Sequence, residues 1–221
     1  MATIVITGSN RGIGLRLARL YAEAGHQLVS GVRSPEAATD LPGEVLPLDV
    51  GDDASVAAFA QALGGRPVDI LINNAGISGP ERQSTLDMDF PGFLQTLNVN
   101  TLGPLRVTQA LLPNLRAASS AKVAVISSRM GSFTDPATNM IAYRASKTAV
   151  NKLIQGLAAD LAPEGIALVA LHPGWVRTDM GGAAADLAPE ESAAGLKTVI
   201  DGLSPATSRQ FRSYDGSAID W

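Results

Sequence analysis

The most informative segment of the chain is residues 3–14, which read TIVITGSNRGIG. Its first five residues are apolar or β-branched, as is typical of a strand buried on both faces. A glycine turn follows directly, and an apolar stripe at helical spacing follows the turn. Gly8 permits a tight turn, Gly12 lets a ligand approach the backbone amides, and Gly14 lets the helix pack closely on the sheet. Such a unit can hold a pyrophosphate at the positive end of its helix. The alternative is a plain glycine turn, which does not need to lie between a buried strand and a helix.

The rest of the chain repeats this alternation of short apolar runs and longer helical patterns. We expect further strands at residues 27–32, 44–48, 68–73, 122–127, 166–172 and 210–213. Helical spacing between them is clearest at 93–115, where Pro104 can kink the helix, and at 142–161 and 190–203. Alternation of this kind produces right-handed βαβ units and a parallel sheet covered by helices on both faces. The sequence therefore predicts a three-layer α/β Rossmann fold, doubly wound, with about seven strands, as a single domain over residues 1–221.

Composition excludes several classes of protein. Of the 221 residues, 46% are hydrophobic and 17% charged, which argues against a disordered chain. Without cysteine there is neither a disulfide framework nor a thiolate metal site, and two separated histidines do not make a metal site. A net charge of −4 argues against nucleic-acid binding. No apolar run is long enough to span a membrane and no basic segment precedes Thr3, so we expect a cytoplasmic protein without a metal.

The end of the second expected strand distinguishes the two nicotinamide cofactors. Sheets that bind NAD usually place Asp or Glu there, to bind the ribose hydroxyls. Residues 28–34 read LVSGVRS and contain no acid, but they offer Arg33, and Arg11 lies in the glycine turn. Two guanidinium groups suit a 2′-phosphate and predict NADP(H), although both arginines could instead be ordinary surface charges. Residues after the third and fourth strands, Asp49-Val50 and Asn74-Ala75-Gly76, extend the same groove.

A second group of residues carries the expected chemistry. Tyr143 and Lys147 lie four apart, so both side chains project from one face of a helix. A cation one turn away favours phenolate and lowers the pKa of the phenol, which suits a general acid that protonates a carbonyl oxygen as hydride reaches the carbon. Taken alone, this spacing is more typical of an ordinary surface pair. Ser127 and Ser128 end the fifth strand, where a hydroxyl can polarise the carbonyl, and Asn100 occupies a helix interior, where Asn is intrinsically unfavourable.

Together these pieces make the chain resemble a classical short-chain dehydrogenase/reductase. The matching segments are TGSNRGIG, NNAG, the segment around Asn100, ISSRMG, YRASK and HPGWVRT, in the family's order. The resemblance implies NAD(P)-dependent oxidoreduction with a catalytic triad of Ser128, Tyr143 and Lys147. Ser128 rather than Ser127 matches the family's Ser-x-x-Gly pattern, although its spacing to Tyr143 is longer than the commonest one. The resemblance also implies that Asn100 places a water of a proton relay and that Lys147 binds the nicotinamide ribose.

Turns that follow the strands are expected to line the cofactor groove. A rigid Pro-Gly bend at 173–174 would support the nicotinamide, and Thr178 would bind its carboxamide or a phosphate. The residues expected to contact the cofactor are Gly8, Ser9, Asn10, Arg11, Gly12, Ile13, Gly14, Arg33, Asp49, Val50, Asn74, Ala75, Gly76, Tyr143, Lys147, Pro173, Gly174, Val176 and Thr178.

Within the family, the segments YRASKTAVN, HPGWVRTDMGG and YDGSAIDW are similar to the C-factor and sniffer-like carbonyl reductases. This similarity implies an NADPH-dependent reductase of a ketone, aldehyde or quinone, present as a monomer, homodimer or homotetramer. Two other functions stay open. One is a dinucleotide-binding signalling or sensor protein with little turnover, since C-factor is associated with bacterial signalling. The other is an NAD-linked alcohol dehydrogenase.

Three weaker features concern loops and the end of the chain. Apolar residues near the expected nicotinamide end either line a substrate pocket or pack beneath the loops; they are Phe133, Met140, Trp175 and Met180. His26 and His172 suit structural roles beside strands. The terminal segment 214–221 is unusually apolar for a tail, and we expect it to dock near the site or to pair with another subunit.

Overall fold

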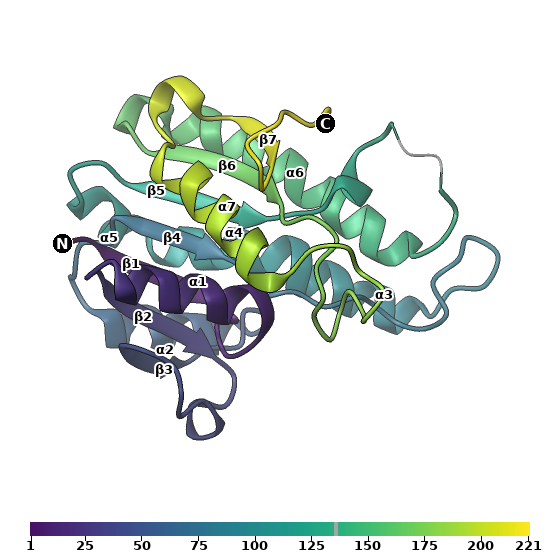
Figure 1. Ribbon diagram of the computed structural model, residues 1–221, viewed down its shortest axis with the longest axis horizontal. Helices are drawn as coiled ribbons and strands as arrows, with labels where there is room; N and C mark the ends of the chain where they lie inside the picture. Colours follow the sequence, from purple (N-terminus) through teal and green to yellow (C-terminus); the bar gives the residue numbers. More distant parts are fainter. Residues whose placement is uncertain (135–136) are drawn as a thin grey trace.

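The computed structural model describes residues 1–134 and 137–221. Within those residues, seven strands form one sheet in the order β3-β2-β1-β4-β5-β6-β7, and every neighbouring pair is parallel (Figure 1). The strands are β1 (Thr3–Thr7), β2 (Gln27–Val32), β3 (Glu44–Pro47), β4 (Ile70–Asn73), β5 (Lys122–Ile126), β6 (Ala167–His172) and β7 (Gln210–Ser213). The predicted parallel sheet is therefore confirmed. β1, β2 and β7 have the predicted bounds, and the other four strands are slightly shorter than predicted.

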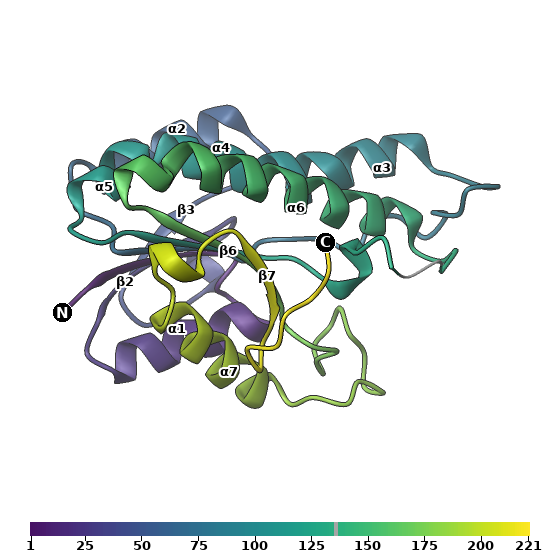
Figure 2. The same ribbon diagram turned by 90° about the horizontal axis from the view of Figure 1, so that it is seen from above.

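Helices cover both faces of the sheet, which gives the three layers that the sequence predicts. The helices are α1 (Gly12–Glu23), α2 (Asp53–Leu63), α3 (Phe90–Leu97), α4 (Gly103–Ala110), α5 (Leu112–Ala117), α6 (Ile141–Leu161) and α7 (Pro189–Asp201). Figure 2 shows α1 and α7 on one face of the sheet and the other five helices on the opposite face. This arrangement is the doubly wound Rossmann architecture.

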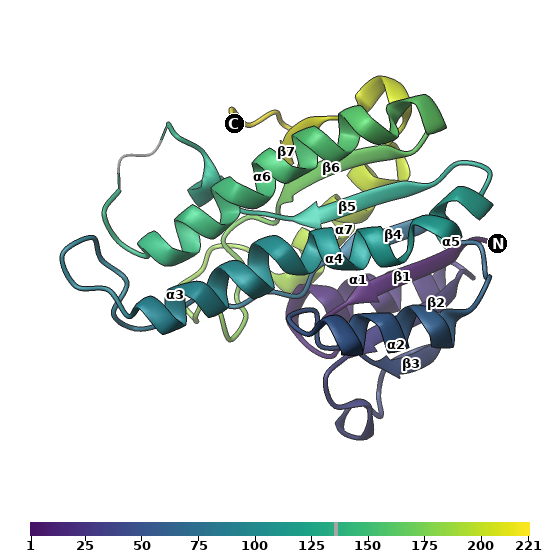
Figure 3. The ribbon, with the colours of Figure 1, turned by 180° about the vertical axis from the view of Figure 1, so that it is seen from behind.

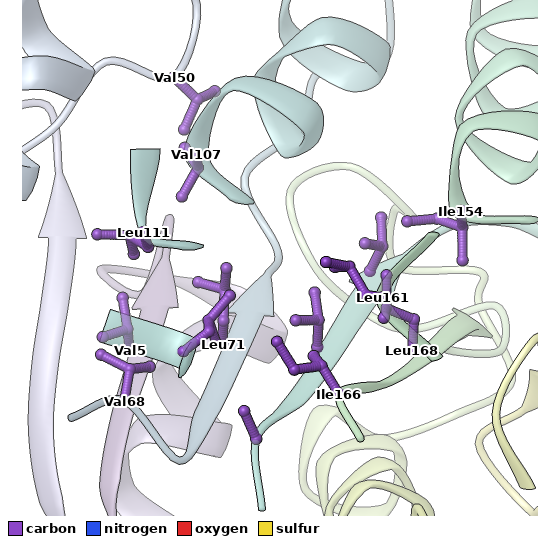
Figure 4. Close-up of a cluster of buried hydrophobic side chains, with 14 of the residues drawn as sticks. Val5, Val50, Val68, Leu71, Val107, Leu111, Ile154, Leu161, Ile166 and Leu168 are labelled. Carbon is purple, nitrogen blue, oxygen red and sulfur yellow. The ribbon is translucent and has the colours of Figure 1, made fainter. Parts of the chain in front are cut away.

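The core is divided by the sheet into two apolar clusters. Successive strand residues point to opposite faces, so Val5 packs beneath α2 and α4 while Ile4 and Ile6 pack against α1 and α7. Figure 4 shows part of the first cluster, where Leu71 and Leu168 from two strands meet side chains from α4 and α6. Burial on both faces explains why the strands read as nearly continuous apolar runs.

The helix predicted at 93–115 is the main error in the sequence-based description of the fold. The structure instead contains α3, a π-helical turn at Asn98–Leu102, α4 and α5, and α3 begins earlier than predicted, at Phe90. Pro91, Pro104 and Pro113 each lie in the first turn of one of these helices. Proline has no backbone N–H and is tolerated in a first turn, where that group has no partner within the helix. The prolines therefore mark the starts of three helices rather than a kink in one.

The sheet topology determines where a ligand site can form. β1 lies between β2 and β4, so the chain leaves β1 in one direction across the sheet and later continues in the other from β4. In open α/β sheets, ligands bind at the carboxyl ends of the strands where the order reverses in this way. The segments after β1, β4, β5 and β6 meet at this edge, as Figure 1 allows the reader to follow.

The end of the chain folds back onto its own sheet edge. The backbone N–H of Ile219 donates to the carbonyl of Phe211 at 2.8 Å, and the Trp221 ring stacks on the Phe211 ring with centroids 5.6 Å apart. Ile219 and Trp221 also pack against the first apolar cluster. The tail thus covers β7, and at its start Tyr214 lies beside Gly174, where a Cβ would be 3.2 Å from its ring, which agrees with the expected docking near the site. Pairing with another subunit stays a prediction. Among the described residues, no helix combines the length and the apolar character that crossing a bilayer requires.

Candidate active site

The glycine turn after β1 leaves the start of α1 open. Gly8 and Gly12 have φ of 66° and 54°, in the left-handed region that favours glycine. Arg11 precedes the helix and makes no side-chain cap, so the first N–H groups of α1 stay available to a ligand. A Cβ on Gly12 would lie 3.3 Å from Cγ2 of Thr178, so the turn and the segment after β6 face each other at this point. The turn and the uncapped helix start thus have the form that the sequence predicts, and the binding of a phosphate there stays a prediction.

Side chains at the ends of β1 and β4 hold the turn in this shape. The Thr7 hydroxyl oxygen accepts from the backbone N–H groups of Asn74 and Ala75, each at 3.0 Å. The Asn74 amide nitrogen donates to the carbonyls of Thr7 and Gly8 at 3.1 and 2.9 Å. A Cβ on Gly14 would lie 2.5 Å from that amide nitrogen and from the Gly8 carbonyl oxygen, which leaves no room for any other residue. The Asn74 side chain was predicted to contact the cofactor, but its amide nitrogen is used inside the protein to support the turn.

Two arginines lie near the glycine turn, as predicted, but one of them has a partner that the sequence did not indicate. Arg33 is exposed just beyond β2, and the backbone N–H of Gly8 donates to the Gly31 carbonyl at 2.8 Å, which places the turn beside that strand end. Nη1 of Arg11 lies 2.8 Å from Oδ2 of Asp179, in the segment after β6. Both side chains of this pair are mostly exposed, at 61% and 78%. The two guanidinium groups therefore remain accessible to an anion.

The two residues after β3 that were predicted to contact the cofactor differ in their exposure. Asp49 is exposed, and its side chain accepts the backbone N–H of Gly51 at 2.8 Å. Val50 is buried against α4, where a Cβ on Gly103 would lie 2.9 Å from its Cγ2. The Val50 carbonyl accepts from Nη1 of Arg106 at 2.6 Å. A cofactor contact through Val50, as predicted, would compete with these packing roles.

Ser128, Tyr143 and Lys147 lie together at the carboxyl end of β5. Tyr143 and Lys147 sit one turn apart near the start of α6, and the Lys147 Nζ is 5.6 Å from the centroid of the Tyr143 ring. The Lys147 ammonium donates to the Ile126 carbonyl at 2.8 Å, and the Ser128 side chain lies near enough to the Tyr143 phenol to lower its pKa. Ser127 points elsewhere, because its hydroxyl donates to the Asn151 side chain at 2.6 Å. The preference for Ser128 over Ser127 thus agrees with the geometry.

Burial controls the ionisation of this group. It lowers the pKa of Lys147 to about 8, because the ammonium loses solvation in the protein. It also raises the pKa of Tyr143, and the nearby Ser128 side chain only opposes this effect. The expectation that the cation would lower the pKa of the phenol is therefore wrong for this form of the protein. The Lys147 ammonium is directed at the Ile126 carbonyl, and desolvation of the phenol dominates.

A short turn presses the segment carrying Ser128 against α6. Ser128 caps a 3₁₀ turn, Arg129–Gly131, by accepting from the Met130 backbone N–H at 3.2 Å. A Cβ on Gly131 would lie 2.7 Å from the carbonyl carbon of Lys147. The Thr148 hydroxyl donates to the Gly131 carbonyl at 3.0 Å. Glycine at this position thus allows the close approach that brings Ser128 to Tyr143.

Asn100 lies within the π-helical turn and connects two parts of the site. Its Oδ1 accepts the Ile77 backbone N–H at 2.8 Å, and its Nδ2 donates to the Ile77 carbonyl at 2.8 Å and to the Ser146 hydroxyl at 3.0 Å. A Cβ on Gly76 would lie 3.2 Å from Asn100 Oδ1 and 3.7 Å from Lys147 Nζ. Asn100 therefore ties the segment after β4 to α6, directly beside Lys147. The placing of a water by Asn100 stays a prediction.

The segment after β6 completes this edge of the sheet. Gly174 has φ of 85°, and a Cβ there would lie 2.7 Å from Cδ2 of Leu187. The Pro173 carbonyl accepts from the Ser192 hydroxyl at 2.6 Å, Val176 is buried, and the Thr178 hydroxyl accepts the Gly181 backbone N–H at 3.2 Å. The predicted Pro-Gly bend is therefore built as a rigid turn, with Thr178 carried towards Gly12.

The histidines and the apolar loop residues fall into two kinds. The Nδ1 of His26 accepts the Ala2 backbone N–H at 3.3 Å, as suits a structural residue. Burial and the charge of Arg129 lower the pKa of His172 to about 4, so its ring is neutral at neutral pH. Among the described residues, no group of acidic or histidine side chains could hold a metal. Phe133 and Trp175 are 85% and 53% exposed, so neither packs beneath a loop.

Comparison with known proteins places the chain in a family. The family model for short chain dehydrogenases matches residues 2–187, so the chain belongs to that family, as its motifs indicated. Among curated relatives, C-signal of Myxococcus xanthus is 46% identical over 165 residues, covering 74% of this chain and 99% of the relative. The 1-hydroxy-2-glutathionyl-2-methyl-3-butene dehydrogenase of Rhodococcus sp. is 33% identical over 230 residues and covers 100% of both.

Solved structures with this fold include carbonyl reductases. Carbonyl reductase Sniffer of D. melanogaster superposes with a TM-score of 0.93 at 31% identity, over 100% of both chains. The NADPH-bound carbonyl reductase from chicken fatty liver superposes with a TM-score of 0.92 at 32% identity, over 100% of this chain and 99% of that one. The similarity to C-factor and sniffer-like reductases, inferred from sequence motifs, is confirmed.

Proposed function

We propose that this protein is an NADPH-dependent carbonyl reductase that converts a ketone, aldehyde or quinone to the alcohol. The observation that carries the proposal is the grouping of Ser128, Tyr143 and Lys147 at the sheet edge where the glycine turn lies: the turn that Ser128 caps packs against α6, and Lys147 Nζ lies 5.6 Å from the centroid of the Tyr143 ring. A phenol and a hydroxyl that converge on one point can both reach a single carbonyl oxygen. The chicken relative, which is described as an NADPH-bound carbonyl reductase, supports both the cofactor and the substrate class.

The residues around the groove fit a dinucleotide with a 2′-phosphate. The uncapped start of α1 and the glycines of its turn offer N–H groups to a pyrophosphate. Arg33 and Arg11 offer exposed guanidinium groups near the ends of β2 and β1. The Pro173-Gly174 bend and Thr178 would hold the nicotinamide end. The Lys147 ammonium would bind the ribose hydroxyls there.

In the proposed reaction, the bound reduced nicotinamide supplies a hydride to the carbonyl carbon. The Ser128 hydroxyl donates a hydrogen bond to the carbonyl oxygen, and Tyr143 transfers its phenolic proton to the same oxygen. One hydride and one proton together convert the carbonyl to an alcohol. Because burial raises the pKa of Tyr143, the phenol holds its proton at neutral pH and can act as the acid.

The proposal is tested by following NADPH absorbance during incubation with a panel of ketones, aldehydes and quinones. We expect consumption of NADPH, equal in amount to the alcohol formed, with at least one class of carbonyl compound. If no carbonyl compound is reduced while NADPH binds, the proposal is wrong and the protein is a dinucleotide-binding sensor. The relative named C-signal is the observation that favours this second candidate.

The choice between NADPH and NADH has its own test. Titrations of the protein with each cofactor should show tighter binding of NADPH. Arg33→Ala should weaken NADPH binding about tenfold or more, because one charge-assisted hydrogen bond is lost, and should leave NADH binding nearly unchanged. Tighter binding of NADH by the unmodified protein would instead support an NAD-linked alcohol dehydrogenase.

Two further proposals concern the whole chain. We propose that residues 1–221 form one nucleotide-binding domain, because a single sheet organises both apolar clusters. Urea unfolding should then show one cooperative transition. We also propose that the protein acts in the cytoplasm on a small molecule and binds neither nucleic acid nor membrane. Sedimentation would measure its subunit number, on which the proposed catalysis does not depend.

A further inference from the structure

The helix that carries Tyr143 begins without a cap of its own. Met140 precedes α6 with φ of 54° and ψ of 41°, a left-handed conformation, and makes no side-chain cap hydrogen bond. The first N–H groups of any α-helix have no acceptor within that helix. Tyr143 is the third residue of α6, so its own backbone N–H is among these groups. The position of Tyr143 therefore depends on an acceptor from elsewhere in the chain.

Gln83 supplies that acceptor from a segment 60 residues away in sequence. Its side-chain Oε1 accepts the Tyr143 backbone N–H at 3.1 Å, and its backbone carbonyl accepts the Ile141 backbone N–H at 2.9 Å. Figure 3 shows the segment before α3 beside the start of α6, and Figure 1 shows the same neighbourhood from the opposite side. One residue thus satisfies two of the open N–H groups of the helix, including the one on Tyr143.

The Gln83 side chain is itself held in place. Its Nε2 donates to the Ser78 carbonyl at 3.0 Å and to the Pro80 carbonyl at 2.7 Å. A Cβ on Gly79 would lie 3.0 Å from Oε1, so the segment closes tightly around the amide. The side-chain oxygen, the side-chain nitrogen and the backbone carbonyl of Gln83 thus each have a hydrogen-bond partner that fixes their orientation. The amide cannot rotate without breaking contacts on both sides.

Gln83 and Asn100 hold α6 at two points one turn apart. Asn100 connects Ile77 to Ser146, and Gln83 connects the following residues to Tyr143. The segment after β4 is therefore linked through Asn100 to the Ser146 hydroxyl at one end and attached through Gln83 to the backbone of Ile141 and Tyr143 at the other. A shift in that segment moves the Tyr143 backbone, and with it the phenol that must meet Ser128.

We propose that Gln83 is a positioning residue for Tyr143, which caps the catalytic helix from another segment and thereby sets where the phenol proton is delivered. This proposal rests on the proposed function, in which Tyr143 is the general acid. Misplacing a reacting group by a fraction of an ångström to one ångström can cost ten- to a hundredfold in rate, so a single lost cap contact is sufficient to be measured. A residue that acts on proton delivery should change kcat and leave the binding of NADPH unchanged.

Three variants separate positioning from a general loss of stability. Gln83→Ala removes both the acceptor and the donors of the side chain. Gln83→Glu keeps an acceptor oxygen for Tyr143 but loses the donors to Ser78 and Pro80. Gln95→Ala is the matched control, because Gln95 is an exposed glutamine on the neighbouring α3 and its side chain takes part in none of these contacts.

We expect Gln83→Ala to lower kcat about tenfold with an unchanged KM for NADPH, and to lower Tm by about 2–4 °C. Gln83→Glu should lower kcat by a similar factor, because its second carboxylate oxygen would face the Ser78 and Pro80 carbonyl oxygens and could not hold the side chain in place. Gln95→Ala should match the unmodified enzyme in every respect. Unchanged kcat in Gln83→Ala would overturn the proposal, and so would equal loss of kcat in Gln83→Ala and Gln95→Ala.

A second measurement does not depend on turnover. Hydrogen–deuterium exchange of the peptide that contains Ile141 and Tyr143 should be faster in Gln83→Ala and in Gln83→Glu than in the unmodified protein, and normal in Gln95→Ala. Equal exchange in all variants would show that Gln83 does not hold this turn, whatever the activity. If the unmodified protein reduces no carbonyl compound, the proposed function fails, while the exchange experiment still decides whether Gln83 positions the backbone of Tyr143.

Discussion

The two ends of the proposed cofactor groove are built in opposite ways. At the phosphate end, the protein presents backbone: the polar groups of Thr7 and Asn74 point inward and are used to shape the turn around Gly14. At the catalytic end, the protein presents side chains: Ser128 precedes a 3₁₀ turn, and Tyr143 and Lys147 lie on α6; Ser128 and Lys147 are buried and Tyr143 is half-buried. The phosphate end depends on the absence of side-chain atoms at its glycines. The catalytic end depends on the presence of particular polar side-chain atoms.

This difference indicates how each end fails. Added atoms should damage the phosphate end, because no space remains around its glycines. Removed atoms should damage the catalytic end, because each polar group there has a specific partner. Four substitutions, with matched controls, test this contrast.

The largest expected effect is that of an added methyl group at the phosphate end. A Cβ on Gly14 would lie 2.5 Å from two polar atoms, so Gly14→Ala should displace α1 or Asn74 and cost about 3 kcal/mol of stability. Gly156→Ala is the control, because a Cβ there meets nothing within 4 Å on an exposed turn of α6. That variant should gain about 0.5–1 kcal/mol. Urea unfolding measures both, and equal stability of the two variants would refute the contrast.

At the catalytic end, the hydroxyls of two neighbouring serines should differ in effect. Removal of the Ser128 hydroxyl should lower the rate, and removal of the Ser127 hydroxyl should lower the stability. Ser128→Ala should lower kcat about a hundredfold with little change in stability. Ser127→Ala leaves Oδ1 of the buried Asn151 without its donor, so it should cost about 1–3 kcal/mol of stability and keep its turnover. Steady-state kinetics and urea unfolding of the two variants distinguish them. Similar kinetics for both would contradict the assignment of Ser128.

The buried ammonium of Lys147 predicts a pH dependence of stability. Burial lowers its folded pKa from 10.5 to about 8, so the folded protein loses free energy below pH 8 by keeping the ammonium charged. This cost disappears as the pH rises from about 8 towards 10.5. Compared with Lys147→Met, the unmodified protein should therefore gain about 2 kcal/mol of unfolding free energy between pH 8 and 10. A difference between the two proteins that stays constant over this range would show that Lys147 is not desolvated as described.

The smallest effect concerns the exposed ion pair between Arg11 and Asp179. Asp179→Asn frees the guanidinium and removes a negative charge from its neighbourhood, so it should tighten NADPH binding by about two- to fivefold and leave NADH binding unchanged. Glu190→Gln breaks the comparable pair with Arg16, between α1 and α7, and should change neither affinity. Fluorescence titration measures the dissociation constants. Equal effects of the two variants would show that Asp179 has no special relation to the phosphate end.

Local patterns were sufficient to predict the sheet and most of the site. The strands follow from short runs of Val, Ile and Leu, and the pairing of Tyr143 with Lys147 follows from helical spacing. Glycines at 8, 12 and 14 indicate the turn because each meets a steric or conformational demand that the structure shows. These features depend on neighbours in sequence, so the sequence alone reveals them.

Features that depend on distant partners could not be predicted in the same way. Gln83 lies in a segment without periodicity and meets Tyr143 only in the folded chain. Asp179 reaches Arg11 across 168 residues. The raised pKa of Tyr143 results from burial, which no local pattern specifies. The separate helices between residues 90 and 117 were missed because their prolines were read as one kink rather than as helix starts.

The central claim is that Tyr143 gives the proton that completes carbonyl reduction. It is tested most directly by single-turnover measurement of NADPH oxidation, with the enzyme–NADPH complex formed first and then mixed with a carbonyl substrate. Tyr143→Phe should bind NADPH as tightly as the unmodified enzyme and oxidise it at least about a hundredfold more slowly. A Tyr143→Phe variant that oxidises bound NADPH at the unmodified rate would contradict the account.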